Sequence, residues 1–101
     1  MKTIALSVSG NRISPRLDCA GKLLLVHAND SNIKTKEHLN LSSEDPLNNI
    51  NVLTQLKPDV LICGGLTELY SNKLKNSKIK VIPWVQGDTE KILSLYMDGR
   101  L

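Results

Sequence analysis

Two cysteines are the residues with the clearest capacity for metal or redox chemistry. Cys19 and Cys63 lie far apart, and no Cys-x-x-Cys pair or suitably spaced histidine accompanies them. They therefore predict neither a disulfide framework nor a zinc site, although two thiolates would suit a soft metal or an iron–sulfur species. Cys19 follows Arg16 in a polar segment, and nearby positive charge favours the thiolate. Cys63 ends an apolar run, where a free cysteine is more commonly a core residue than a ligand.

A glycine pair is the second candidate for binding chemistry. Gly64 and Gly65 precede Thr67 and a segment with helical spacing. Glycine lets a backbone approach a ligand, and unpaired N–H groups at a helix start favour an anion. One interpretation is an anion cradle assisted by Arg12 or Arg16. The alternative is a tight turn in which Thr67 only caps the helix.

The other ionisable residues do not form a catalytic pattern. His27 and His38 have no acid at a useful sequence spacing, and we expect both to be structural or exposed, away from the candidate site. Asp18 is the one carboxylate expected near that site, and one carboxylate cannot supply a paired acid–base or two-metal arrangement. No nucleophile-elbow or phosphate-loop motif is present. A non-enzymatic function is therefore expected.

These residues must be positioned by the surrounding strands and helices. Apolar runs bounded by turn residues predict five strands, over residues 3–9, 22–28, 33–41, 60–63 and 80–85. Apolar residues at helical spacing predict three helices, with Asp45 as the cap of the first and Asp88 as the cap of the third. The short turn over 29–32 predicts that the strands over 22–28 and 33–41 form an antiparallel hairpin. The later strand–helix–strand unit predicts that the strands over 60–63 and 80–85 are parallel and joined by a right-handed crossover. Residues 1–101 therefore form one three-layer α/β domain.

The predicted topology brings the candidate residues to one edge of the sheet. Ligands of open sheets bind beyond the carboxyl ends of parallel strands, where the strand order reverses. That point lies between the strands over 3–9 and 60–63, which we expect to be parallel neighbours, and segment 11–21 must return over the same end. The candidate cofactor-binding residues there are Arg12, Ser14, Arg16, Asp18, Cys19, Gly64, Gly65 and Thr67, with Cys19 and Cys63 as candidate metal ligands.

The composition is that of an ordinary globular protein. Hydrophobic residues make up 41% and charged residues 23%, and no apolar run reaches the ~18 residues of a membrane helix. We expect a cytoplasmic protein without membrane contact. The net charge is +3, and Lys73, Lys75, Lys78 and Lys80 cluster where the second helix should end. Cations there complement the helix dipole, and no aromatic residue or arginine joins them, so nucleic-acid binding is not expected.

Trp84 is the single tryptophan of the chain and follows Pro83 at the end of the last predicted strand. A lone tryptophan in such a place more often covers the core than forms an interface. We therefore predict that Trp84 is largely buried and packs on the third helix. The alternative is an exposed interface residue.

Several segments, taken in order, resemble a known family. They are IALSV at 4–8, ISPRLDCA at 13–20, PDVLICGG at 58–65, IKVIPW at 79–84, GD at 87–88 and GRL at 99–101. Together they resemble the dinitrogenase iron–molybdenum cofactor biosynthesis family over nearly the whole chain. The resemblance implies a ribonuclease H-like motif, with a five-stranded mixed sheet in the order 3-2-1-4-5 and strand 2 antiparallel. It also implies non-catalytic binding of an iron–sulfur cluster or iron–molybdenum cofactor precursor at the Ser-Pro loop, with metallocluster assembly proteins as partners.

The chain departs from the family's pattern at that loop. Members that carry the cofactor tend to have His after Ser-Pro, then Phe-Gly, whereas this chain has Arg16, Leu17 and Asp18. Without the imidazole, Cys19 and Cys63 remain as candidate ligands. Two functions stay open, namely a metallocluster carrier and a protein-interaction module of the same fold without a metal ligand. A nuclease is excluded because the first strand lacks the carboxylate that nucleases of this topology place there, and whether the protein is a homo-oligomer is left open.

Overall fold

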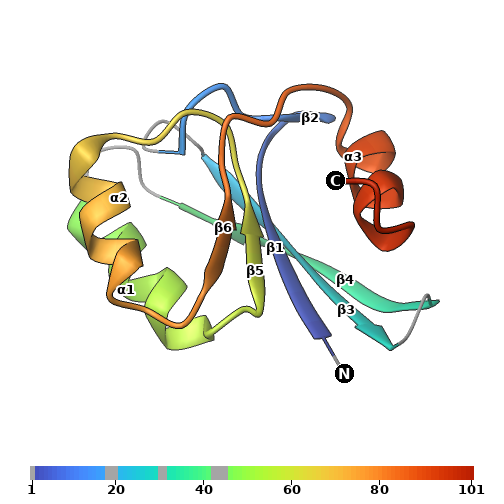
Figure 1. The fold of residues 1–101 in the computed structure, drawn as a ribbon, viewed down its shortest axis with the longest axis horizontal. Helices are drawn as coiled ribbons and strands as arrows, with labels where there is room; N and C mark the ends of the chain where they lie inside the picture. Colours follow the sequence, from blue (N-terminus) through green and yellow to red (C-terminus); the bar gives the residue numbers. More distant parts are fainter. Residues whose placement is uncertain (1, 18–20, 30–31, 42–45) are drawn as a thin grey trace.

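A twisted mixed sheet forms the centre of the molecule (Figure 1). The computed structural model describes residues 2–17, 21–29, 32–41 and 46–101. The sheet's main path runs β4-β3-β1-β5-β6, with β1 at Lys2–Ser9, β3 at Lys22–Asn29, β4 at Asn32–Asn40, β5 at Val60–Ile62 and β6 at Lys80–Ile82. β3 is antiparallel to β1 and β4, whereas β1, β5 and β6 are parallel. The predicted α/β class, the order of the five strands and the parallel central pair are confirmed.

The sheet has a sixth strand, which corrects the prediction of five. β2, at Arg12–Ile13, turns back against the end of β1 and pairs Ile13 with Val8. A strand of two residues is too short to carry a periodic hydrophobic pattern. The reversal passes through Gly10, whose φ of +62° lies in the left-handed region that glycine adopts without a steric penalty.

Three helices connect the strands, α1 at Pro46–Leu56, α2 at Glu68–Lys75 and α3 at Thr89–Met97. Pro46 opens α1, where a missing N–H costs no hydrogen bond, and its expected cap Asp45 lies outside the described residues. Asp88 caps α3 as predicted, its side chain accepting the Lys91 N–H at 3.2 Å. Thr67 caps α2, its side chain accepting the Tyr70 N–H at 3.3 Å, which agrees with the alternative interpretation of the glycine pair. Within the described ranges, no helix is long and apolar enough to cross a membrane.

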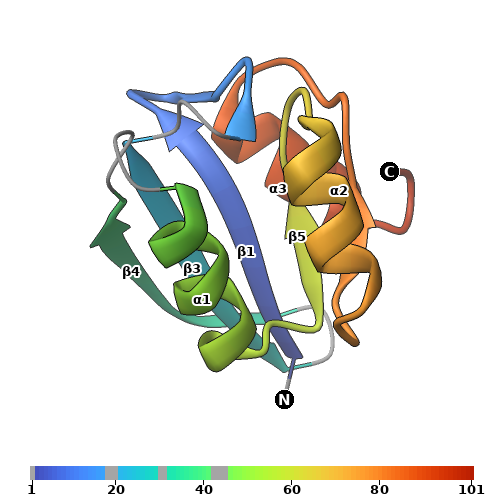
Figure 2. The same ribbon diagram turned by 90° about the vertical axis from the view of Figure 1, so that its left-hand side faces the viewer.

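The helices form two layers around the sheet. Figures 1 and 2 show α1 and α2 together on one face and α3 on the other. Alternate residues of β1 enter these layers, since Ala5 packs with α1 and α2 whereas Ile4 and Leu6 pack with α3. The core beneath α1 and α2 also contains Leu25, Leu53, Leu61 and Leu74. The core beneath α3 also contains Val26, Ile62, Ile92 and Leu93. Successive strand side chains point to opposite faces, so one sheet fills both cores.

β4 is an exposed edge of the sheet. Lys34 and Lys36 stand on this strand among other exposed residues, and lysines on an edge strand discourage pairing with another chain. The Nζ of Lys36 lies 3.1 Å from Oε1 of Glu90 and links β4 to α3. This contact links the edge strand β4 to α3, the helix that covers one face of the sheet.

Candidate functional site

The carboxyl ends of β1, β5 and β6 meet at one edge of the sheet, the carboxyl edge, formed by residues 10–17, 63–67 and 83–88. Segment 10–17 folds over this edge, at the top of Figure 1. The Ile13 N–H donates to the Gly87 carbonyl at 3.0 Å, and the Ser14 N–H donates to the Ser7 carbonyl at 2.9 Å. These bonds join the returning segment both to β1 and to the turn before α3.

The glycine pair is contacted by the chain's own backbone. The N–H of Gly65 donates to the Pro15 carbonyl at 2.7 Å, and the Leu17 N–H donates to the Gly65 carbonyl at 2.9 Å. A Cβ on Gly64 would overlap the carbonyl oxygens of Ser14 and Pro15. Gly64 is therefore required for the close approach of the returning segment, which is a steric reason distinct from an anion cradle.

Trp84 adopts a left-handed backbone conformation just after β6. Its φ is +64°, and this conformation costs a bulky residue about 1–3 kcal/mol. Two hydrogen bonds hold it, because the Trp84 N–H donates to the Gly64 carbonyl at 2.9 Å and the Val85 N–H donates to the Cys63 carbonyl at 3.0 Å. The same geometry ends β6 at Ile82, short of the predicted strand over 80–85.

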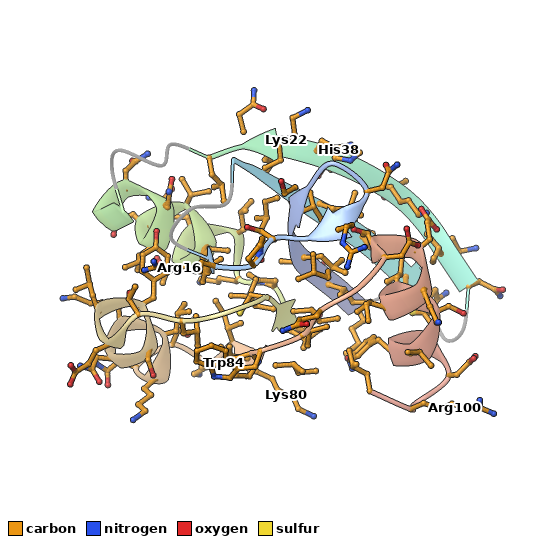
Figure 3. The ribbon with its side chains drawn as sticks, turned by 90° about the horizontal axis from the view of Figure 1, so that it is seen from above. Arg16, Lys22, His38, Lys80, Trp84 and Arg100 are labelled. Atoms are coloured by element: carbon orange, nitrogen blue, oxygen red, sulfur yellow. The ribbon has the colours of Figure 1, made fainter. Side chains whose placement is uncertain are left out.

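Trp84 is 72% exposed, so the prediction of a buried Trp84 on the third helix is wrong. The left-handed conformation turns this side chain outward, and Ile82 and Val85 pack against the α3 core instead. The ring lies over Gly65, because a Cβ added there would be 3.0 Å from Cζ3 of Trp84. Figure 3, which looks down on the carboxyl edge, shows Trp84 beside β6.

A pocket of about 350 Å³ lies beside this ring. Its volume is at the small end of the range for ligand sites. The residues that line it are Arg12, Ile13, Pro15, Gly64, Gly65, Trp84, Gln86 and Gly87. Arg12 is the charged member of this lining, and none of these residues carries a carboxylate. The pocket therefore has the charge to receive a small anion.

The other predicted site residues lie apart from this pocket or have structural roles. Ser14 is buried, and its Oγ donates to the Arg16 carbonyl at 2.9 Å. Arg16 is exposed but does not line the pocket, and Figure 3 places it toward α1 and α2. Thr67 serves as the cap of α2, in line with the alternative interpretation. Asp18 and Cys19 lie outside the described residues.

The thiol of Cys63 is fully buried in the apolar core beneath α1 and α2. Burial raises its pKa to about 12, because apolar surroundings penalise the thiolate. A metal binds the thiolate rather than the thiol. This environment favours a core role for Cys63 over that of a metal ligand.

His38 is exposed, as one of the two expected roles has it, but each histidine differs from the sequence-based expectation in one respect. His27 has an acid partner, since its Nε2 lies 3.4 Å from Oε1 of Glu37. His38 lines a pocket with Lys22 and the turn after β1, close to the end of the sheet where no histidine was expected, and Figure 3 shows these two side chains close together. Both contacts join different strands, so they depend on sheet register rather than on local spacing.

A larger pocket, about 620 Å³, lies at the opposite, amino edge of the sheet, formed by residues 54–59 and 73–79. Lys57, Lys73 and Lys78 line it together with Asp59. Sequence reasoning missed this pocket because it forms only where the ends of α1 and α2 meet in space. The available signal was the run of lysines, of which Lys73 and Lys75 lie in the last turn of α2 as predicted.

Comparisons with known proteins agree with the fold. No protein-family model and no curated protein matches the chain. The crystal structure of PH0822 is similar with a TM-score of 0.89 at 14% identity, over 98% of this chain and 91% of that one. MJ0327 from Methanocaldococcus jannaschii, provisionally named a dinitrogenase, has a TM-score of 0.82 at 21% identity, over 98% and 90%. The apo form of the orange protein from Desulfovibrio gigas has a TM-score of 0.78 at 22% identity, over 99% and 90%. At these identities the likeness shows a shared fold.

Proposed function

We propose that this protein is a non-catalytic domain that binds an iron–sulfur cluster, or an iron–molybdenum cofactor precursor, during metallocluster assembly. The observation that carries the proposal is the pocket at the carboxyl edge, where Arg12 is the charged lining residue and no carboxylate joins it. Clusters rich in sulfide and thiolate are anions, so their charge complements this pocket. The provisional dinitrogenase name of MJ0327 supports the same context.

The guest is held by charge and shape rather than by a set of protein ligands. In the part of the chain that the structure describes, no three His, Cys, Asp or Glu side chains are grouped to hold a metal ion. The guest therefore keeps its own ligands while Arg12 donates charge-assisted hydrogen bonds from outside. Cys19, two positions after Leu17 in the sequence, is the thiol that could add one ligand. Binding of this kind is reversible, as a transient carrier requires.

The pocket lining supports binding without catalysis. None of its residues is His, Asp, Glu, Lys, Cys or Tyr, and an arginine stays protonated. General acid–base catalysis needs a titratable group within hydrogen-bond reach of the substrate. The lining residues therefore bind and orient a guest but do not move protons.

An anaerobic titration with a reconstituted iron–sulfur donor, followed by charge-transfer absorption, tests the proposal. We expect uptake by the wild type and an affinity about tenfold lower for Arg12→Ala, the effect of losing a charge-assisted contact. Lys73→Ala is the matched control, since it removes an equal charge at the amino edge, and it should bind as the wild type does. No uptake by the wild type, or unchanged affinity in Arg12→Ala, contradicts the proposal. Cys19→Ser in the same titration measures the contribution of that thiol.

A protein-interaction module of the same fold is the second candidate. The observation that favours it is the exposed Trp84 side chain, because aromatic residues are enriched in the cores of interfaces. The anaerobic titration distinguishes the cluster-binding domain from the interaction module, because only the former takes up a cluster. A folded wild-type protein that takes up no cluster under any donor concentration favours the interaction module.

A further inference from the structure

β6 is an edge strand whose outer side is open. It ends the sheet path β4-β3-β1-β5-β6, so among the described residues no strand pairs with it on the side away from β5. The Lys80 N–H donates to the Asp59 carbonyl at 3.2 Å, and the Cys63 N–H donates to the Ile82 carbonyl at 3.1 Å. Backbone groups of successive strand residues point to alternate sides, so the N–H and carbonyl of Val81 point away from β5. These two groups are available to a further strand.

The two edges of the sheet differ in how they are protected. Almost all residues of β4 are exposed, and its Lys36 is held by Glu90. β6 instead has two apolar residues, Val81 and Ile82, that are only half-buried. An apolar edge strand with open backbone groups is a template for pairing. β6 is therefore the edge suited to take another strand.

A hollow of about 290 Å³ lies beside this edge, between β6 and α2. Most of its lining is apolar, and none of the lining residues carries a carboxylate. These residues are Leu66, Ser71, Leu74, Lys75, Ser77, Ile79, Val81 and Pro83. Side chains of an added strand alternate between the two faces of the sheet, so every second one would lie on the face of α2 and the hollow. The hollow thus suits the apolar side chains of an extended segment.

The charges at this edge are positive. Lys80 is exposed on the face of β6 opposite to Val81, and Figure 3 shows its side chain extending away from the sheet. It stands in a strand, so its charge offsets no helix dipole. Lys75 is also exposed and lines the hollow. A second copy of this chain would bring the same lysines together at a shared edge, whereas a strand that carries carboxylates would complement them.

We propose that the outer edge of β6 binds an extended acidic segment of a partner protein, which adds to the sheet as a further strand. Apolar side chains of that segment fill the hollow beside α2, and the acidic side chains that alternate with them face Lys80. Val81 supplies the main-chain N–H and carbonyl for the new pairing. The inference goes beyond cluster binding and does not depend on it, because the hollow and the carboxyl-edge pocket share no lining residue.

Three blocked, fluorescein-labelled peptides test the proposal by fluorescence anisotropy. EVEIEVE alternates carboxylates with apolar residues, EVEPEVE has proline in place of the central isoleucine, and KVKIKVK reverses the charge. We expect EVEIEVE to bind at least about tenfold more tightly than the other two, since proline removes a strand hydrogen bond and lysines repel Lys75 and Lys80. Bound EVEIEVE should also slow the hydrogen exchange of the Val81 N–H, as NMR measures. Equal binding of either control peptide, or unchanged exchange at Val81, overturns the proposal.

Two variants at one position separate the backbone from the side chain. Val81→Pro and Val81→Ala both remove the valine side chain, but only the proline removes the outward N–H, and it leaves the bonds between β5 and β6 in place. We expect the affinity for EVEIEVE to be at least about tenfold lower in Val81→Pro than in Val81→Ala. Lys80→Gln should weaken binding about threefold, whereas Lys34→Gln, which removes an equal charge at the β4 edge, should bind as the wild type does.

The remaining outcomes are also decisive. If the wild type binds no peptide, or if Val81→Pro and Val81→Ala bind alike, strand addition at β6 is wrong. If the wild type sediments as a dimer that Val81→Pro dissociates, a second copy occupies the edge and the acidic partner is overturned. If circular dichroism shows Val81→Pro to be unfolded, the exchange of the Val81 N–H in the wild type decides instead. None of these results changes the expected cluster uptake, so the inference and the proposed function fail separately.

Discussion

The two edges of the sheet carry pockets that are both lined by basic residues but differ in size and in what those residues do. The amino-edge pocket is larger, about 620 Å³, and three lysines line it, whereas the carboxyl-edge pocket has about 350 Å³ and one arginine. Yet the amino-edge lysines stand near the ends of α1 and α2, where cations offset the helix dipoles. The Asp59 carboxylate there also accepts the Thr3 N–H at 2.7 Å and helps to order the strands. The charges of the amino-edge pocket therefore have a structural explanation.

The same contrast holds for backbone strain. Lys57 has a φ of +49° and follows the last residue of α1, and its N–H donates to the Leu53 carbonyl at 3.2 Å. A left-handed residue at this position is a common way for a helix to end. Trp84, with a φ of +64°, ends no helix. The comparison teaches that an unusual conformation points to function only where the local structure gives no reason for that side chain.

Gly64→Ala should have the largest effect on the molecule and act on the carboxyl edge. The new Cβ would lie 2.6 Å from the carbonyl carbon of Pro15 and overlap two carbonyl oxygens, so backbone has to move. We expect the free energy of unfolding to fall by about 3 kcal/mol or more, as for severe overpacking. Urea denaturation followed by circular dichroism measures the change.

Gly21→Ala is the control for this substitution. A Cβ at Gly21 meets nothing within 4 Å, so the variant should keep wild-type stability or gain up to about 1 kcal/mol through the unfolded state. If Gly64→Ala and Gly21→Ala are equally stable, the close approach of segment 14–15 to Gly64 does not stabilise the carboxyl edge. The comparison of the two edges would then lack its structural basis.

Cys63→Ala should change how stability depends on pH above about pH 9. The pKa of this thiol is raised from 9.0 to about 12 in the folded protein, so the native state holds the proton more tightly than the unfolded state does. The resulting stabilisation is complete below about pH 9 and is lost as the pH rises toward 12, at about 1.4 kcal/mol per pH unit. Wild-type stability should therefore fall more steeply than that of the variant between about pH 9 and pH 11.

Urea denaturation at several pH values checks this expectation. Lysines and tyrosines titrate in the same range, but they are common to both proteins, so only the difference in slope reports Cys63. Parallel pH profiles would mean that the thiol is not held protonated in the core, and Cys63 would return as a candidate ligand at the carboxyl edge.

Lys57→Gly should have the smallest effect and sharpen the comparison of the two strained residues. Glycine adopts the left-handed conformation without a steric penalty, so we expect a gain of about 0.5–1 kcal/mol in the free energy of unfolding. Cluster uptake should be unchanged, because Lys57 lines the amino-edge pocket and not the carboxyl-edge pocket. Thermal unfolding measures the gain, and a clear loss of stability would instead assign a structural role to the Lys57 side chain.

The fold could be predicted from sequence because its signals are local. Uniformly apolar runs such as 60–62 and helix caps such as Thr67 and Asp88 specify elements without knowledge of their neighbours. Segment 12–16 could also be placed beside Gly64 and Gly65, because the carboxyl ends of parallel strands share an edge. Element order and hydrophobic pattern were sufficient for these inferences.

The chemistry of the site was harder to predict because it depends on contacts between distant segments. The requirement for Gly64 arises from the carbonyl groups of Ser14 and Pro15, which no local pattern reveals. The exposure of Trp84 depends on the sign of its φ. That backbone conformation is held in part by hydrogen bonds to the carbonyl groups of Cys63 and Gly64, which follow β5. Likewise the pair of His27 and Glu37 depends on the register of two strands.

The central position of β1 also has a consequence for how the chain folds. β1 pairs with β3 across the connecting segment 10–21, but its pairing with β5 joins segments as far apart as Thr3 and Asp59, which are separated by 56 positions. Closing so long a loop carries an entropic barrier that the hairpin of β3 and β4 does not face. We therefore expect the antiparallel half of the sheet to assemble early and the docking of the β5–β6 half onto β1 to be the slower step. The carboxyl-edge pocket is lined by residues from both halves, so we expect it to form only when they dock.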